Sequence, residues 1–287
     1  MSQWAERRER FRAILNGTAC VHPGSVYDAM SARIAQHVGY EIGMVGGSSA
    51  SLAVLGAPDL IVMTLTEFAE QCLRMNRASE LPIMVDADHG YGNALNVMRT
   101  VEELENAGVA ALSIEDTELP QPFGADGPRL ISIEEGVGKM RAALEARRDP
   151  GFVIAGRTSA VMISGLDDAI ARAQAYQQAG VDALFFVGVR RRDQLDALAE
   201  ALRVPIILGG AGPDLLDLDY LSSRGVRVCL QGHQPFAAAV RAVHDTLKAL
   251  REGTRPAELE GIASRDLMRQ VTRDEDFQRW IDSFLRD

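Results

Sequence analysis

Eight short apolar runs recur along this chain, each followed by a polar or glycine-rich turn and then by an amphipathic stretch of helical length. An apolar run between turn signals is typical of a buried strand, whereas apolar residues three and four positions apart indicate a helix. Strands that alternate with helices favour a parallel sheet with right-handed crossovers. We therefore predict strands at residues 18–22, 42–45, 83–86, 110–115, 152–157, 183–187, 205–208 and 227–231.

Eight such strand–helix units in a chain of 287 residues favour a closed barrel over an open sheet. Gly108, Gly180 and Gly225 each come shortly before a predicted strand, where glycine fits the left-handed position that follows a helix. No Gly-x-Gly-x-x-Gly follows a strand, so a dinucleotide-binding sheet loses its main support. We predict an α/β fold, a (β/α)8 TIM barrel, with helices at residues 95–107, 134–146, 167–179 and 192–202.

The whole chain, residues 1–287, fits a single barrel domain with a helical extension at each end. We expect an N-terminal helix over about 1–16, the barrel over about 17–250 and a helical tail over about 251–287. Apolar residues of the tail gather at 267–271 and 277–285, and no Ser/Gly-rich linker precedes them. The tail is therefore expected to pack on the barrel or on a neighbouring subunit.

Composition narrows the class of protein. A formal net charge of −10 argues against nucleic acid or an anionic membrane as a partner. Cys20, Cys72 and Cys229 show no Cys-x-x-Cys spacing, which disfavours disulfides and a structural zinc site. The first residues are charged and lack the apolar region of a signal peptide, and no run is long enough to span a bilayer. We expect a cytoplasmic protein.

Acidic side chains follow two of the predicted strands. Asp86 and Asp88 come after one apolar run, and Glu115 and Asp116 come after the next. Carboxylates that are close together repel one another unless a cation, a proton or a donor lies between them. The pattern predicts a divalent metal site at one edge of the sheet, with Glu115 a better candidate ligand than Asp116. The alternatives are a helix cap and ordinary salt bridges.

Other polar groups fall at the same edge. Arg157 ends an apolar run, so its guanidinium could clamp a substrate carboxylate or simply pair with one of the acids. His233 follows the last strand and could contact the substrate, move a proton or play no part. Ser48 could supply a hydroxyl and backbone N–H groups to a carboxylate, or be an ordinary turn residue. His89 could orient the acids or react.

Four motifs, in this order, resemble the isocitrate lyase/phosphoenolpyruvate mutase superfamily. They are Val45-Gly46-Gly47-Ser48, Asp86-Ala87-Asp88-His89-Gly90-Tyr91-Gly92, Ile114-Glu115-Asp116 and Gly156-Arg157-Thr158. The resemblance implies a Mg²⁺-dependent barrel that acts on 2-oxo acid or enolpyruvate substrates. It also implies a homotetramer, a dimer of dimers, with a C-terminal helix swapped between subunits. Within the superfamily, residues 93–100, residues 134–139 and Gly232-His233 are most similar to the oxaloacetate decarboxylase branch.

The same resemblance implies roles for individual residues. Asp86 would bind Mg²⁺ directly, and Asp88, Glu115 and Asp59 would hold it through water. The substrate would be contacted by Ser48, Gly47, Arg157 and His233, with Arg157 and His233 as the catalytic residues. Mn²⁺ is an alternative metal, and no organic cofactor is implied.

The loop after the fourth strand separates this chain from sister enzymes. Those lyases carry a Lys-Lys-Cys-Gly-His type sequence there, whose cysteine is the catalytic acid. Residues 119–128 contain no cysteine, lysine or histidine, which argues against isocitrate or methylisocitrate cleavage. The loop also lacks polar residues that would hold a migrating phosphoryl group. One departure from the decarboxylase branch is the segment 209–213, Gly-Gly-Ala-Gly-Pro, where that branch has a tyrosine.

The resemblance predicts Mg²⁺-dependent decarboxylation of oxaloacetate to pyruvate and CO₂ through a metal-stabilised enolate. The alternatives are a C–C lyase or hydrolase acting on another 2-oxo or 2-hydroxy diacid and, less favoured, a phosphonate mutase. A catalytically silent metabolite-binding barrel is the non-enzyme alternative. Closely spaced acids favour catalysis, because a protein that only binds diacids would sooner use several arginines.

Overall fold

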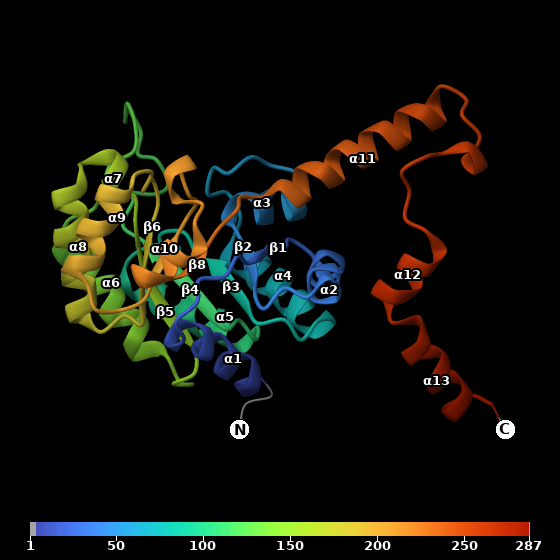
Figure 1. Cartoon of the computed structure of the whole chain (residues 1–287), viewed down its shortest axis with the longest axis horizontal. Helices are drawn as coiled ribbons and strands as arrows, with labels where there is room; N and C mark the ends of the chain where they lie inside the picture. The colour runs from blue at the N-terminus through green and yellow to red at the C-terminus, as the bar shows by residue number, and fades with distance from the viewer. Residues whose placement is uncertain (1–3, 287) are drawn as a thin grey trace.

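Eight parallel strands form one curled sheet in chain order in the computed structural model, which describes residues 4–286 (Figure 1). A parallel bridge between Val21 and Val228 joins the segment before the first strand to the last strand. The Val21 N–H donates to the Arg227 carbonyl at 2.9 Å, and the Cys229 N–H donates to the Val21 carbonyl at 3.0 Å. The predicted (β/α)8 barrel is confirmed. Its strands are β1 (Gly24–Ser25), β2 (Gly43–Val45), β3 (Ile83–Asp86), β4 (Ala111–Glu115), β5 (Val153–Thr158), β6 (Ala183–Phe186), β7 (Ile206–Leu208) and β8 (Val226–Cys229).

The prediction of a first strand at 18–22 is wrong, whereas the other seven strands lie where they are predicted. β1 begins at Gly24, which pairs with Gly43 of β2. Proline has no backbone N–H to give to a ladder, and Pro23 separates Val21 from β1. The pairing is therefore divided: Val21 bonds to β8 on one side, and Gly24–Ser25 bond to β2 on the other.

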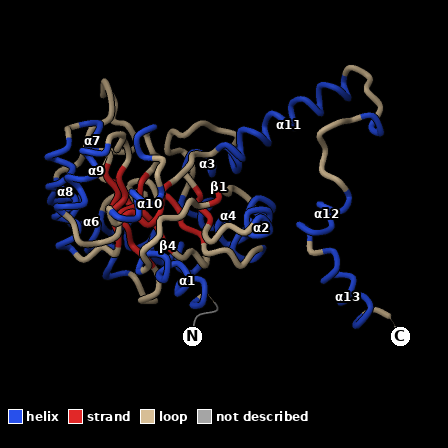
Figure 2. Tube along the Cα trace, in the orientation of Figure 1, coloured by secondary structure: helices blue, strands red, loops and turns tan. Residues whose placement is uncertain are grey.

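Helices surround the sheet on its outer face (Figure 2). Several begin with a side-chain cap: Asp28, Thr64 and Asn93 each accept the backbone N–H three residues later, which satisfies a donor that the first turn leaves free. Gly108, Gly180 and Gly225 have φ of +86°, +103° and +77°, as predicted for turns from helix to strand. The helices before and around the strands are α1 (Ala5–Asn16), α2 (Ala29–Val38), α3 (Gly47–Leu55), α4 (Leu65–Ala78), α5 (Ala94–Asn106), α6 (Ile133–Ala146), α7 (Ala160–Ile163), α8 (Leu166–Ala179), α9 (Arg192–Ala201) and α10 (Leu218–Ser223), with a short 3₁₀ turn η1 (Pro213–Leu215).

Apolar side chains fill the barrel as well as the space between sheet and helices. Inside, Met44, Met84 and Phe185 pack with Phe11 of α1, which is fully buried. The buried Arg8 of the same helix donates to the carbonyls of Val109 and Glu105. α1 therefore packs against the amino-terminal end of the barrel, leaving the carboxyl-terminal strand ends as the place for a site.

The chain leaves the barrel after β8. α11 (Gln234–Arg251) projects outward (Figure 1) and has no buried residue. It is followed by η2 (Pro256–Glu258), α12 (Arg265–Thr272) and α13 (Asp274–Phe284). α12 contacts α2: Val271 is buried, and Arg33 donates to the Thr272 carbonyl at 3.1 Å. None of the helices in residues 4–286 is long and apolar enough to cross a membrane.

Candidate active site

Three neighbouring strands bring Asp86, Glu115 and Arg157 together at their carboxyl ends. The register aligns Asp86 of β3 with Ser113 of β4, and Glu115 of β4 with Arg157 of β5. Asp88 lies just beyond β3 in a turn where its φ is +48°, a left-handed conformation that is uncommon for residues other than glycine. The turn brings Asp88, which is only 8% exposed, back toward the other acids.

Arg157 lies among these carboxylates. Its Nη1 donates to Asp86 Oδ2 and lies 3.6 Å from Glu115 Oε1. Its guanidinium also lies over the Phe185 ring, 5.5 Å from the centroid. Burial alone would lower the pKa of Arg157, but Asp86 and Glu115 raise it above the usual value. The pairing of Arg157 with an acid is one of the two arrangements that the sequence leaves open.

The acids repel one another. Burial first, then Asp86, Glu115 and Asp59, raise the pKa of Asp88 well above its usual value. Burial likewise raises the pKa of Glu115 against the opposing effect of Arg157. Glu115 accepts a hydrogen bond from the Thr117 hydroxyl. The mutual repulsion of these acids therefore persists although Arg157 lies beside them.

The donor set fits a hard divalent cation. Carboxylate oxygens are the ligands that Mg²⁺ prefers, and it often binds through one or two of them and keeps its remaining waters. Arg157 Nε is buried and has no hydrogen-bond partner among the described residues, so one donor remains for a further acceptor. Within residues 4–286 no three His, Cys or acidic side chains form a preformed metal-ligating group; here Arg157 pairs with Asp86.

Asp59 lies on the exposed segment between α3 and α4. Loss of hydration first, and then the nearby Asp86, raise the pKa of its carboxyl group, whereas Arg157 and His233 lower it. The structure therefore places Asp59 within electrostatic range of the cluster, at its outer side.

Two successive glycines bring the start of α3 against the site. A Cβ at Gly46 would overlap the imidazole of His233, and a Cβ at Gly47 would lie 2.7 Å from Asp88 Oδ1. Ser48 follows in the first turn of the helix α3. The free N–H groups of a helix start favour anions, so Ser48 and its neighbours lie where a carboxylate can be bound.

His233 is held by a residue that the sequence analysis does not single out. Its Nδ1 lies 2.8 Å from the Ser25 hydroxyl. Burial lowers the pKa of His233, although Asp86 and Asp59 raise it, which favours a neutral imidazole near pH 7. Ser25 and His233 are 208 residues apart, and no local motif indicates their contact.

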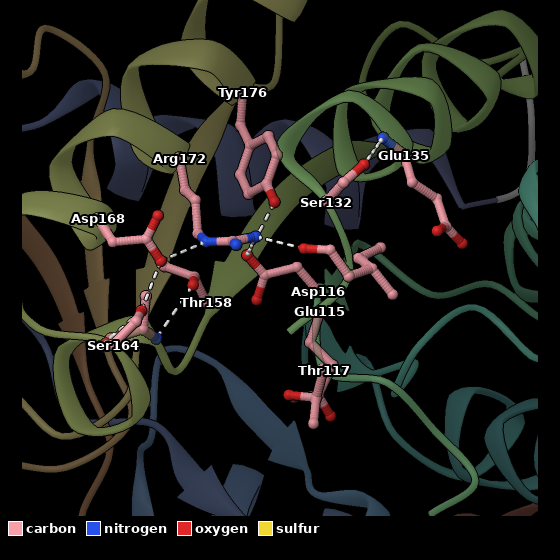
Figure 3. Close-up of polar contacts among 12 residues, drawn as sticks. Glu115, Asp116, Thr117, Ser132, Glu135, Thr158, Ser164, Asp168, Arg172 and Tyr176 are labelled. Carbon is pink, nitrogen blue, oxygen red and sulfur yellow. Dashed lines mark hydrogen bonds and ion pairs between the residues drawn. The ribbon is translucent and has the colours of Figure 1, made fainter. Parts of the chain in front are cut away.

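Two candidates lie outside the cluster. Asp116 points away from it, toward Arg172 and Tyr176 behind the sheet (Figure 3). His89 is buried with Nδ1 lacking a partner among the described residues, and burial lowers its pKa to about 4. The His89 carbonyl accepts from Lys139 Nζ at 3.0 Å. His89 thus contributes to the turn that carries Asp88.

The close approach of Gly47 to Asp88 gives a testable prediction. The Gly47→Ala variant is expected to bind Mn²⁺ about 10–100-fold more weakly, because the new methyl group must displace the Asp88 carboxylate. Mn²⁺ titration followed by electron paramagnetic resonance measures this. Gly138→Ala in α6 is the matched control, because nothing lies within 4 Å of its added Cβ. Equal Mn²⁺ affinity of both variants would contradict the assignment of Asp88.

A closed α/β barrel with a carboxylate cluster at its carboxyl-terminal strand ends is typical of a barrel enzyme. The chain belongs to the phosphoenolpyruvate phosphomutase family, whose model matches residues 11–251.

Curated relatives match nearly the whole chain. The oxaloacetate decarboxylase of Bradyrhizobium sp. strain BTAi1 is 60% identical over 97% of this chain and 97% of its own length. That of Rhodopseudomonas palustris strain BisA53 is 59% identical over 98% of both.

Solved structures share the fold at lower identity. Oxaloacetate acetylhydrolase in complex with 3,3-difluorooxalacetate has a TM-score of 0.85 at 27% identity and covers 97% of each chain. Phosphonopyruvate hydrolase in complex with oxalate and Mg²⁺ has a TM-score of 0.83 at 26% identity, covering 98% of this chain and 99% of its own.

Proposed function

We propose that this chain decarboxylates oxaloacetate to pyruvate and CO₂ with the help of a divalent cation, Mg²⁺ or Mn²⁺. The observation that carries the proposal is the buried carboxylate cluster with a single arginine. Relatives named oxaloacetate decarboxylase, about 60% identical over nearly the full length, support the choice of substrate.

The metal would be held by oxygen ligands. Asp86 is the proposed direct ligand, and Asp88, Glu115 and Asp59 are proposed to hold the ion through water. The electrostatic basis is the mutual repulsion that raises the pKa of Asp88 and that a cation would relieve. When bound, the ion would polarise the 2-oxo group and stabilise negative charge on its oxygen as the C3–C4 bond breaks.

The residues around the cluster are proposed to hold the substrate. Arg157 offers its unpartnered Nε to a carboxylate oxygen. Ser48 and Gly47, at the start of α3, offer a hydroxyl and backbone N–H groups to the same end of a diacid. His233, positioned by Ser25, is proposed to contact the carboxylate that departs or to relay a proton to the product carbon.

The exposed apolar residues of the C-terminal helices α11 and α13 support an oligomer. α11 carries the exposed apolar residues Val240, Val243, Leu247 and Leu250, and α13 carries the exposed Phe277 and Phe284. Covering such apolar surface is favourable. We propose a homotetramer, a dimer of dimers, in which these helices pack on a neighbouring subunit.

The function is tested by pyruvate formation from oxaloacetate with Mg²⁺, with EDTA and without protein. Turnover well above the protein-free Mg²⁺ control, lost with EDTA and restored by excess Mg²⁺, is expected. Because one structural neighbour is an oxaloacetate acetylhydrolase, acetate and oxalate are assayed in the same samples. Appearance of acetate and oxalate in place of pyruvate would reassign the reaction to hydrolysis, and no product above the control would refute both reactions.

A further inference from the structure

Asp116 is fully buried and points toward Arg172 and Tyr176, whereas the neighbouring Glu115 points the other way (Figure 3). Adjacent residues of a strand point to opposite faces, so Glu115 faces the cluster while Asp116 faces the layer between β4 and α8. Asp116 Oδ2 accepts from the Tyr176 hydroxyl at 2.8 Å and from Arg172 Nη1 at 3.2 Å. Both partners belong to α8.

Arg172 connects Asp116 to two other segments. Its Nε donates to Asp168 Oδ2 at 2.8 Å, and Ser164 donates to the same carboxylate. Its Nη1 also donates to the Ile131 carbonyl at 2.9 Å. Ile131 lies at the end of the loop that leaves β4 and returns to α6. The Arg172 guanidinium therefore joins α8, the end of β4 and the C-terminal side of this loop.

At the base of the loop between β4 and α6, its two ends are joined by a short ladder of backbone hydrogen bonds. Thr117 and Leu130 form an antiparallel bridge, and the Glu118 N–H donates to the Arg129 carbonyl at 2.8 Å. The Ile131 N–H donates to the Asp116 carbonyl at 2.9 Å. Ile131 is thus bonded through its N–H to Asp116 and through its carbonyl to Arg172. Beyond this ladder the loop is exposed, and at its tip lies the fully exposed Phe123.

We propose that Arg172 is a positioning residue that fixes the base of the 117–131 loop and, through Asp116, the direction of Glu115. Arg172 touches neither the carboxylate cluster nor the proposed substrate position. It holds the loop through its own hydrogen bond to the Ile131 carbonyl and through the Asp116–Ile131 hydrogen bond. It acts on Glu115 through Asp116 and the peptide bond between the two acids. Its part in turnover rests on the proposed function, whereas its part in holding the loop does not.

The ladder contains a site that reports on the loop base directly. The Arg129–Leu130 bond is a trypsin site, and residues 118–134 contain no other lysine or arginine. Proteolysis needs a locally opened backbone, so opening of the Thr117–Leu130 bridge should speed this cleavage. Trypsin digestion with mass spectrometry therefore measures the loop base without substrate or metal.

Arg172→Gln is expected to accelerate cleavage at Arg129–Leu130 about tenfold and to weaken Mn²⁺ binding by a similar factor, in the range typical when a supporting contact is lost. Arg172→Lys keeps the positive charge but loses the planar guanidinium and its several N–H donors. It is expected to restore part of the resistance to cleavage and part of the Mn²⁺ affinity. For oxaloacetate, kcat should fall more than KM rises. Arg99→Gln is the matched control, because Arg99 also pairs with two acids, Glu102 and Glu103, but is exposed.

The outcomes separate the two proposals. Unchanged cleavage at Arg129–Leu130 in both Arg172 variants would overturn the positioning role, whatever the activity. Faster cleavage with weaker Mn²⁺ binding supports it even if oxaloacetate is not the substrate. Should Arg172→Gln fail to fold, Arg172→Lys decides, and equal acceleration in Arg99→Gln would show a general loss of stability instead.

Discussion

The Asp86→Asn variant is expected to lose about 10³-fold or more in kcat/KM for oxaloacetate. An amide is a weaker metal ligand than a carboxylate, and transition-state charge that an ion no longer stabilises costs several kcal/mol. The same change removes the charge that Arg157 faces at the end of β3. Glu115, 3.6 Å from Arg157 Nη1, would then be the close acid that remains to Arg157.

Two measurements distinguish loss of the metal site from misfolding. Mn²⁺ affinity should fall with kcat/KM, whereas circular dichroism should be unchanged. Glu145→Gln, on the exposed face of α6, is a control that removes one negative charge far from the cluster. Full Mn²⁺ affinity in Asp86→Asn would contradict the assignment of Asp86 as the direct ligand.

The barrel and most of the cluster could be predicted from local pattern. Buried parallel strands appear as short apolar runs, and the carboxyl ends of neighbouring parallel strands meet at one edge. Polar residues that follow consecutive runs, such as Asp86, Glu115 and Arg157, therefore had to approach one another. The glycines at helix ends were predictable for a similarly local reason, since few other residues adopt positive φ at low cost.

Contacts between distant segments could not be predicted in this way. The position of the first strand could not be predicted, because Val21 and Gly24 bond to opposite neighbours, β8 and β2, which no local pattern indicates. Ser25 meets His233 only because barrel closure brings the two ends of the sheet together. Whether Arg157 pairs with an acid or stays free depends on the charge of the assembled cluster, not on its own strand.

The arrangement around Arg157 predicts an unusual dependence of stability on pH. The Arg157→Gln variant should be destabilised by about 3–5 kcal/mol near neutral pH, because Asp86 and Glu115 lose the one ion-pair partner that each has within residues 4–286. The carboxyl groups of Asp88 and Glu115 already have raised pKa values, and removal of the positive charge raises them further. An acid whose pKa is higher in the folded state than in the unfolded state stabilises the fold at low pH. That contribution is complete below the unfolded-state pKa and is lost as the pH rises through the folded-state pKa.

The destabilisation of Arg157→Gln relative to the wild type should therefore be larger at pH 8 than at pH 5. Urea unfolding at both values measures it, and Mg²⁺ at pH 8 should return part of the loss if the cation binds the freed carboxylates. Arg157→Lys serves as the control for charge, because it keeps the cation but loses the planar contact with Phe185. Equal destabilisation at both pH values would mean that Arg157 acts by packing on Phe185. In that case the carboxylates of the cluster would not depend on Arg157 for their charge balance, and their repulsion would not be a reason for a cation to bind there.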